Sequence, residues 1–183
     1  MRPPFSTEVS VSIEQIQACI RDVPDFPKPG ILFKDITPLL AEPQAFRAAI
    51  EHMAAGLRDW QVDAIVAIES RGFLLGAALA PVMSLPLQIV RKPGKLPWKT
   101  AEVSYALEYG TDRLQIHADS VRAGLRYAIV DDVLATGGTA AATAQLVSGL
   151  GGQVIGCSFL IELGFLHGRE RLGGLRVESL MRY

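Results

Sequence analysis

Short, uninterrupted apolar runs alternate along this chain with longer segments in which apolar residues recur every three or four positions. The uninterrupted runs occupy residues 64–68, 87–90, 127–130 and 154–160. Runs of this length predict strands that are buried on both faces, as in a parallel sheet. Segments at residues 43–57, 71–83 and 138–150 predict helices before and between these strands. The pattern therefore predicts an α/β fold in which helices flank a central, mostly parallel sheet.

The first forty residues follow a different pattern. Ser12 precedes apolar residues at helical spacing, and Gln15 follows it three positions later, which is a capping box. This arrangement predicts a short helix that ends before Pro24. Residues 25–30 are rich in turn residues, and residues 31–33 form a short apolar segment that predicts extended structure.

A basic segment interrupts the alternation of strands and helices after residue 90. Residues 91–99 combine basic side chains with glycine and proline, which predicts a mobile loop. Residues 103–109 and 113–117 then alternate between apolar and polar positions. We expect these two segments to pair as an antiparallel ribbon with Gly110 at the turn.

Composition narrows the classes of function. The chain has 183 residues, of which 49% are hydrophobic and 20% charged, and its net charge is −1. One domain with a substantial core is expected, whereas a surface built to bind nucleic acid is not. Cys19 and Cys157 lie in apolar segments and are expected to be free thiols. No cysteine and histidine pattern suggests a metal site.

The location of the protein is predicted from its apolar segments. The N-terminus lacks an apolar core of signal-peptide length. The apolar stretch at residues 72–85 is short for a membrane span and contains Pro81. We therefore expect a soluble, cytoplasmic protein with no membrane and no nucleic-acid partner.

The strand at residues 127–130 is followed by Asp131, Asp132 and a small loop that enters a helix. The loop contains Ala135, Thr136, Gly137, Gly138 and Thr139. Glycines let the backbone approach a ligand closely, and the first amides of the helix form an anion site sized for one phosphate monoester. Two acids beside that site would repel an anion unless they bind something else, either a sugar diol or a metal ion. The loop is neither a Walker A sequence nor a Gly-x-Gly-x-x-Gly dinucleotide motif.

Other polar residues follow the neighbouring predicted strands. Ligands of open α/β sheets bind outside the carboxyl ends of the strands. This rule places residues 69–71, Arg91 and Lys92 at the same edge of the sheet as Asp131 and Asp132.

The loop and four other segments resemble known family motifs. Residues 130–139 resemble the phosphoribosyl pyrophosphate motif of type I phosphoribosyltransferases over its whole length. The other four segments, which follow the order of the family's motifs, are residues 26–40, 69–73, 91–97 and 104–110. They resemble the N-terminal signature, the pyrophosphate loop, the flexible loop and the catalytic-acid segment of the adenine phosphoribosyltransferase family. Together the matches span roughly residues 24–165.

The resemblance implies a Rossmann-like type I phosphoribosyltransferase fold in a single domain of residues 1–183. Residues 1–40 are then a small N-terminal hood that binds the base, and residues 91–109 are a flexible catalytic loop with antiparallel strands. Part of the basic loop is expected to reach the site of a neighbouring subunit, which implies a homodimer. A non-proline cis peptide bond is expected between Ser70 and Arg71.

The resemblance also implies the reaction, in which adenine and phosphoribosyl pyrophosphate become AMP and pyrophosphate. Mg²⁺ is the implied cofactor and is held mainly through the substrate. Glu108 is the implied catalytic acid/base, because joining adenine to the ribose requires proton transfer on the purine ring. The base stacks on Phe33, and backbone groups of Leu32 and Lys34 read its edge.

The same resemblance divides the phosphate-binding residues into two sets. The ribose phosphate is bound by Asp131, Asp132, Ala135, Thr136, Gly137, Gly138 and Thr139. The pyrophosphate is bound by Ser70, Arg71, Arg91, Lys92, Lys95 and Tyr109.

Alternatives remain for the roles of single residues and for the function of the whole protein. Phe33 as a core aromatic, Arg71 as an exposed helix-opening residue and Glu108 as a solvent-facing strand residue are the simpler interpretations. A phosphoribosyltransferase for an oxopurine would need a donor for the 6-oxo group. A regulator that senses phosphoribosyl pyrophosphate would carry a DNA-binding module or a basic face, and the net charge of −1 argues against it.

Overall fold

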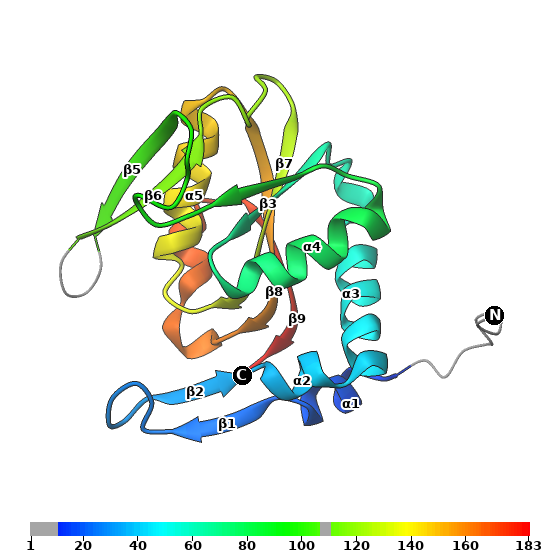
Figure 1. Cartoon of the computed structure of the whole chain (residues 1–183). Coiled ribbons are helices and arrows are strands. Elements are labelled where there is room, and N and C mark those ends of the chain that lie inside the picture. Colours follow the sequence, from blue (N-terminus) through cyan, green and yellow to red (C-terminus); the bar gives the residue numbers. More distant parts are fainter. Residues whose placement is uncertain (1–10, 107–110) are drawn as a thin grey trace. The chain divides into compact units, whose positions relative to one another are not determined.

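A computed structural model describes residues 11–106 and 111–183 of the chain (Figure 1). Internal contacts divide the chain into two units, Met1–Ala49 and Ile50–Tyr183. The boundary falls within helix α3 (Pro43–Leu57), which begins at the predicted residue.

The first unit begins with the predicted capping box. The side-chain oxygen of Gln15 accepts a hydrogen bond from the amide of Ser12 at 2.8 Å, and the hydroxyl of Ser12 accepts one from the amide of Gln15 at 3.3 Å. Helix α1 (Ile13–Ala18) follows. The helix ends before Pro24, as predicted, but its last residue is Ala18, and the strand that follows it was not predicted. Residues 21–24 form β1 (Arg21–Pro24), which pairs antiparallel with β2 (Leu32–Asp35). A short helix, α2 (Thr37–Ala41), follows β2.

Two bonds explain why residues 21–24 are extended. Lys34 Nζ donates to Asp22 Oδ1 at 2.6 Å, and these residues are opposite each other in the β1–β2 register. Asp25 Oδ1 accepts from the amide of Gly30 at 2.7 Å and closes the turn between the strands. Gly30 has a φ of 85°, which glycine adopts without a steric penalty. Partners across the hairpin therefore outweigh the local helical pattern.

The second unit contains the predicted parallel sheet. Its strands have the order β4-β3-β7-β8-β9, and every neighbouring pair is parallel. The strands are β3 (Ala64–Ile68), β4 (Leu87–Val90), β7 (Arg126–Leu134), β8 (Gln153–Glu162) and β9 (Arg176–Arg182). β3 and β4 match their predicted bounds, whereas β9 was not predicted.

β7 is longer than its apolar run. The prediction that this strand ends before the two acids is wrong, because β7 pairs with β8 as far as Leu134 and Glu162. Asp131 and Asp132 therefore lie within the strand and not after it.

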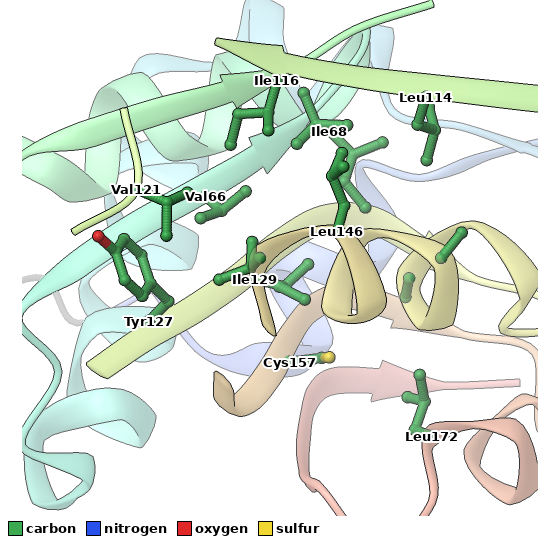
Figure 2. Close-up of a cluster of buried hydrophobic side chains, with 14 of the residues drawn as sticks. Val66, Ile68, Leu114, Ile116, Val121, Tyr127, Ile129, Leu146, Cys157 and Leu172 are labelled. Atoms are coloured by element: carbon green, nitrogen blue, oxygen red, sulfur yellow. The ribbon is translucent and has the colours of Figure 1, made fainter. Parts of the chain in front are cut away.

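Helices cover both faces of this sheet (Figure 1). A Cβ built on Gly76 of α4 (Arg71–Met83) would lie 2.6 Å from the Cβ of Ala67, so α4 packs directly on β3. The opposite face is covered by α5 (Gly138–Gly149), whose Leu146 joins Val66 and Ile68 of β3 in one buried cluster (Figure 2). A 3-10 turn, η1 (Arg58–Trp60), connects α3 to β3.

The predicted ribbon is confirmed with shifted bounds. β5 (Thr100–Ala106) pairs antiparallel with β6 (Thr111–His117), and the predicted turn residue Gly110 lies outside the described residues. Leu114 and Ile116 of β6 are fully buried in the cluster that includes α5 (Figure 2). Two 3-10 turns, η2 (Gly164–Leu166) and η3 (Gly168–Leu172), connect β8 to β9.

Both cysteines are free thiols, as predicted. Cys157 is fully buried in β8, and burial raises the pKa of its thiol to about 12. Within residues 11–106 and 111–183, no helix combines the length and the apolar character that crossing a bilayer requires.

Candidate active site

The order of the strands creates a switch point between β3 and β7. From β3 the chain moves outward to β4, and from β7 it moves outward in the other direction to β8 and β9. In open α/β sheets the crevice at such a point, beyond the carboxyl ends of the strands, is where ligands bind. Glu69 and Arg91 directly follow β3 and β4, and Asp131 lies near the end of β7.

A pocket of about 80 Å³ lies between the end of β7 and the start of α5. It is lined by Asp131, Val133, Leu134, Ala135, Thr136, Gly137, Gly138, Thr139, Ala140 and Phe159. The whole predicted phosphate loop therefore lines a single pocket. The first amides of α5 lack partners within the helix, and they meet the positive end of its dipole. The pocket thus has the chemistry of an anion site.

Gly137 is the residue that this loop conformation requires. It caps α5 with a φ of 79°, in the left-handed region. A Cβ built on Gly137 would overlap the carbonyl oxygen of Gly168, and one built on Gly168 would overlap the carbonyl oxygen of Ala135. The phosphate loop and the start of η3 are thus in backbone contact.

Asp131 and Asp132 have different surroundings. Asp132 is buried and lies 2.7 Å from Nε of Arg71, measured to Oδ2. Burial raises the pKa of Asp132, although the charge of Arg71 acts in the opposite direction. Asp131 lines the pocket, and its pKa is raised well above the ordinary value by burial and by the neighbouring charge of Asp132.

The start of α4 lies close to the end of β7. A Cβ built on Gly72 would be 2.8 Å from Oδ1 of Asp131 and 2.9 Å from the carbonyl oxygen of Val130. Only glycine allows this approach, which brings Arg71 to Asp132. A non-proline cis peptide bond precedes α4, but it joins Glu69 to Ser70. The expectation of a cis bond between Ser70 and Arg71 is therefore wrong by one residue.

Glu69 accepts hydrogen bonds from the basic segment that follows β4. Its Oε1 accepts from Arg91 Nη2 at 2.9 Å and from Lys95 Nζ at 3.0 Å, and its Oε2 accepts from the amide of Lys92 at 2.8 Å. Burial acts to raise the pKa of Glu69, but these bonds outweigh it and lower that pKa to about 2. The carboxylate therefore stays ionised at neutral pH and holds three donors of the 91–95 segment.

A second chain of polar contacts connects the ribbon to the phosphate loop. Lys92 forms an ion pair with Asp112 of β6. The hydroxyl of Tyr105 donates to Oδ2 of Asp112 at 3.2 Å and lies 3.3 Å from Oγ1 of Thr139. These contacts connect Lys92, which is predicted to bind pyrophosphate, to Thr139, which is predicted to bind the ribose phosphate.

The predicted base-binding residues lie in the first unit. Phe33 is half-buried in β2 and packs edge-on against Phe26, with ring centroids 5.1 Å apart. Leu32 and Lys34 flank Phe33 in the strand. Because alternate residues of a strand direct their backbone groups to the same edge, Leu32 and Lys34 share one edge of β2.

Two predicted residues, Glu108 and Tyr109, lie outside the described residues. The structure also reveals contributors to which the sequence assigned no role, namely Asp112, Gly72 and the backbone of Gly168. Asp112 lies in an alternating strand, where an acidic residue usually faces solvent. Gly72 belongs to the 69–73 segment that resembles the pyrophosphate loop, but it acts, like Gly168, through a close approach between segments that are far apart in the sequence, which a local pattern does not show.

Comparisons with known proteins agree on one family. The family model described as phosphoribosyl transferase domain matches residues 36–171. The adenine phosphoribosyltransferase of Synechococcus sp. strain JA-3-3Ab is 62% identical over 158 residues, which cover 86% of this chain and 90% of that relative.

Two crystal structures add to this agreement. The adenine phosphoribosyltransferase of Thermoanaerobacter pseudethanolicus has a TM-score of 0.92 and 52% identity, and the match covers 94% of this chain and 100% of that one. The Saccharomyces cerevisiae enzyme, in a complex that contains adenine, has a TM-score of 0.86 and 37% identity over 92% of this chain and 97% of that one. The chain therefore belongs to the adenine phosphoribosyltransferase family of phosphoribosyltransferases.

Proposed function

We propose that the protein transfers the 5-phosphoribosyl group from phosphoribosyl pyrophosphate to N9 of adenine, giving AMP and pyrophosphate in purine salvage. The observation that carries this proposal is the pocket at the start of α5, bordered by Asp131 and by a cluster of cations at the same sheet edge. Such a site suits a ligand with a phosphate at one end and a diol beside it. The similarity to adenine phosphoribosyltransferases supports adenine as the base.

The phosphate loop binds the 5-phosphate in this proposal. The backbone amides of residues 135–139 and the hydroxyls of Thr136 and Thr139 donate to its oxygens. Asp131 and Asp132 accept hydrogen bonds from the ribose hydroxyls. Arg71 supports this role because its contact with Asp132 counteracts the effect of burial on that carboxyl.

The pyrophosphate binds beside Ser70 and Arg71 and is contacted by Arg91, Lys92 and Lys95. Glu69 positions Arg91 and Lys95 within hydrogen-bond distance of one carboxylate, so both cations are close to the carboxyl end of β3. A multiply charged leaving group is stabilised by such donors as the bond from ribose C1′ to the pyrophosphate oxygen breaks. Tyr109 completes this set in the proposal.

The base and the proton require the remaining residues. Adenine stacks on Phe33, and the backbone groups of Leu32 and Lys34 read its edge. As the bond between N9 and C1′ forms, the imidazole ring of adenine loses a proton, which the carboxylate of Glu108 accepts. General-base catalysis of this kind raises the rate of a reaction by about 10²–10⁴-fold.

Mg²⁺ is the proposed cofactor. Among the described residues, no group of three or more histidine, cysteine or acidic side chains could hold a metal ion. In the proposal the ion arrives on phosphoribosyl pyrophosphate and is held mainly through this substrate. When bound, the ion neutralises charge on the pyrophosphate.

The remaining assignments concern the domain, its flexible loop, the location of the protein and its oligomeric state. Residues 1–183 form one catalytic domain, with residues 1–40 as the base-binding segment and residues 91–109 as a flexible catalytic loop that closes over pyrophosphate. Closure excludes water, which would otherwise attack the cationic ribosyl centre. The protein acts as a cytoplasmic homodimer, and sedimentation of the purified protein would test its mass.

The direct test measures AMP formation from phosphoribosyl pyrophosphate and Mg²⁺ with adenine, hypoxanthine or guanine as the base. Turnover with adenine alone is expected. Preferred turnover of hypoxanthine or guanine would assign the site to a different purine. Ligand binding without any turnover would support the regulator and reject the enzyme.

Two substitutions test the assigned roles. Glu108→Gln is expected to lower the rate of the chemical step while sparing affinity for phosphoribosyl pyrophosphate. Glu102→Gln is the matched control, because Glu102 is an exposed carboxylate of β5 that bonds only Arg113 and Gln115 among the described residues. Normal turnover of Glu108→Gln would remove Glu108 from catalysis. Asp131→Asn with unchanged substrate affinity would contradict the ribose contact.

A further inference from the structure

The turn η3 lies directly against the phosphate loop and presents a cation to it. We propose that Arg171 binds the 5-phosphate of the substrate and supplies positive charge that the loop itself lacks. This inference rests on the proposed function. It adds a residue that follows the parallel sheet's fourth strand, far in sequence from the phosphate motif.

The loop needs an additional cation because its own residues are uncharged. Residues 135–139 contain no basic side chain, and two carboxyls stand beside them. A phosphate monoester carries about −1.5 to −2 charges at pH 7, whereas a helix N-terminus is equivalent to roughly +0.5. The nearby Arg71 is already engaged with Asp132 at 2.7 Å.

Arg171 is placed to supply the missing charge. A Cβ built on Gly138, the first residue of α5, would lie 3.6 Å from Nη1 of Arg171. The ring of Tyr105 approaches the same point, with Cδ2 at 3.8 Å. The guanidinium therefore lies beside the helix terminus that lines the pocket. Arg171 is exposed and forms no hydrogen bond or ion pair with the residues that the structure describes.

The segment that carries Arg171 is fixed on both sides. Arg169 donates to the buried carboxylate of Glu162 at 2.8 and 2.6 Å and to the carbonyl oxygen of Val177 at 2.9 Å. Leu172 is buried in the core cluster (Figure 2). A binding residue held by such neighbours loses little conformational freedom when its ligand arrives. Arg169 and Glu162 are thus positioning residues for Arg171.

The expected effect is confined to ligands that carry the 5-phosphate. Replacing Arg171 by glutamine should weaken binding of AMP and of ribose 5-phosphate about 10-fold, which corresponds to about 1.4 kcal/mol. Binding of adenosine and of inorganic pyrophosphate should be unchanged, because neither places a group at the start of α5. Arg171→Lys should recover most of the affinity for AMP, since it keeps the charge.

The experiment is calorimetric titration of the purified full chain with AMP, ribose 5-phosphate, adenosine and inorganic pyrophosphate. Arg122→Gln is the matched control, because Arg122 is an exposed arginine before β7, at the opposite end of that strand from the pocket. Its affinities should equal those of the unsubstituted protein. Thermal unfolding of each variant checks that the fold is retained.

The outcomes separate this inference from the proposed function. If the unsubstituted protein binds neither AMP nor ribose 5-phosphate, the proposed function itself fails. If AMP binds and Arg171→Gln binds it equally well, only the inference is overturned. An equal loss for adenosine would assign Arg171 a structural role, and a lysine variant as weak as the glutamine variant would reject the supply of charge.

Discussion

The substitution Gly137→Ala tests the contact between the phosphate loop and η3. The new methyl group would meet the backbone of Gly168, overlapping its carbonyl oxygen and lying 3.1 Å from its carbonyl carbon. No side chain can rotate away to relieve this overlap. The residue would also keep a φ of 79°, where a Cβ is unfavourable.

The magnitude follows from these two effects. A left-handed conformation costs a non-glycine residue about 1–2 kcal/mol. Overpacking against a fixed neighbour costs about 1–3 kcal/mol. The lower entropy of the unfolded alanine chain offsets about 0.4–1 kcal/mol of this. We expect a net destabilisation of about 2–4 kcal/mol, which is a large part of the 5–15 kcal/mol typical of a folded protein.

Urea unfolding followed by circular dichroism measures the difference. Gly149→Ala is the matched control, because Gly149 ends the same helix and a Cβ there would meet nothing within 4 Å. That variant should be unchanged or more stable by about 0.5 kcal/mol. If Gly137→Ala unfolds within about 1 kcal/mol of the unsubstituted protein, the loop is free to move away from Gly168 and the reasoning is refuted.

Three further predictions concern acid stability, thiol reactivity and helix capping. Although burial opposes it, bonding lowers the pKa of Glu69 from 4.5 to about 2, so its stabilisation is complete above pH 4.5 and is lost as the pH falls toward 2. The free energy of unfolding should therefore fall less steeply in this range for Glu69→Gln, and parallel curves would contradict the pairing. Iodoacetamide at pH 8 should modify half-buried Cys19 in the native protein but modify Cys157 only after denaturation, and rapid native labelling of Cys157 would contradict its burial. Ser12→Ala should lower the stability of α1 by about 1 kcal/mol, seen as faster amide exchange at Gln15, and unchanged exchange would reject the capping box.

The local sequence pattern was sufficient to predict a strand where both faces of that strand are buried. β3 is buried along its whole length, since it has a neighbouring strand on each side, and its apolar run reported both bounds. β9 is an edge strand whose exposed and buried residues alternate irregularly, so its sequence carries no comparable signal. β1 depends on its partner β2, and the helical spacing around Ile16 and Ile20 gave no indication of that pairing.

The same distinction applies to the candidate site. Parallel strands end at one edge, so the sequence could bring Glu69 near Arg91 although 22 residues separate them. It could not show which oxygen meets which donor, or that Lys95 shares the carboxylate. Asp112 and Arg171 reach the site from a ribbon and from a turn whose directions depend on packing of the whole second unit. Their positions required the structure.

The pairing of Glu69 with Arg91 and Lys95 has a consequence for selectivity among anions. A carboxylate tethered to the same chain is present at a high effective concentration, so it acts as an internal competitor for these two cations. A small free anion gains only its contact with these two cations when it displaces the Glu69 carboxylate. A ligand that also occupies the pocket at the start of α5 draws on a second set of contacts for the same exchange. In the proposed function, Glu69 thereby favours ligands that carry phosphate groups at both ends over small free anions.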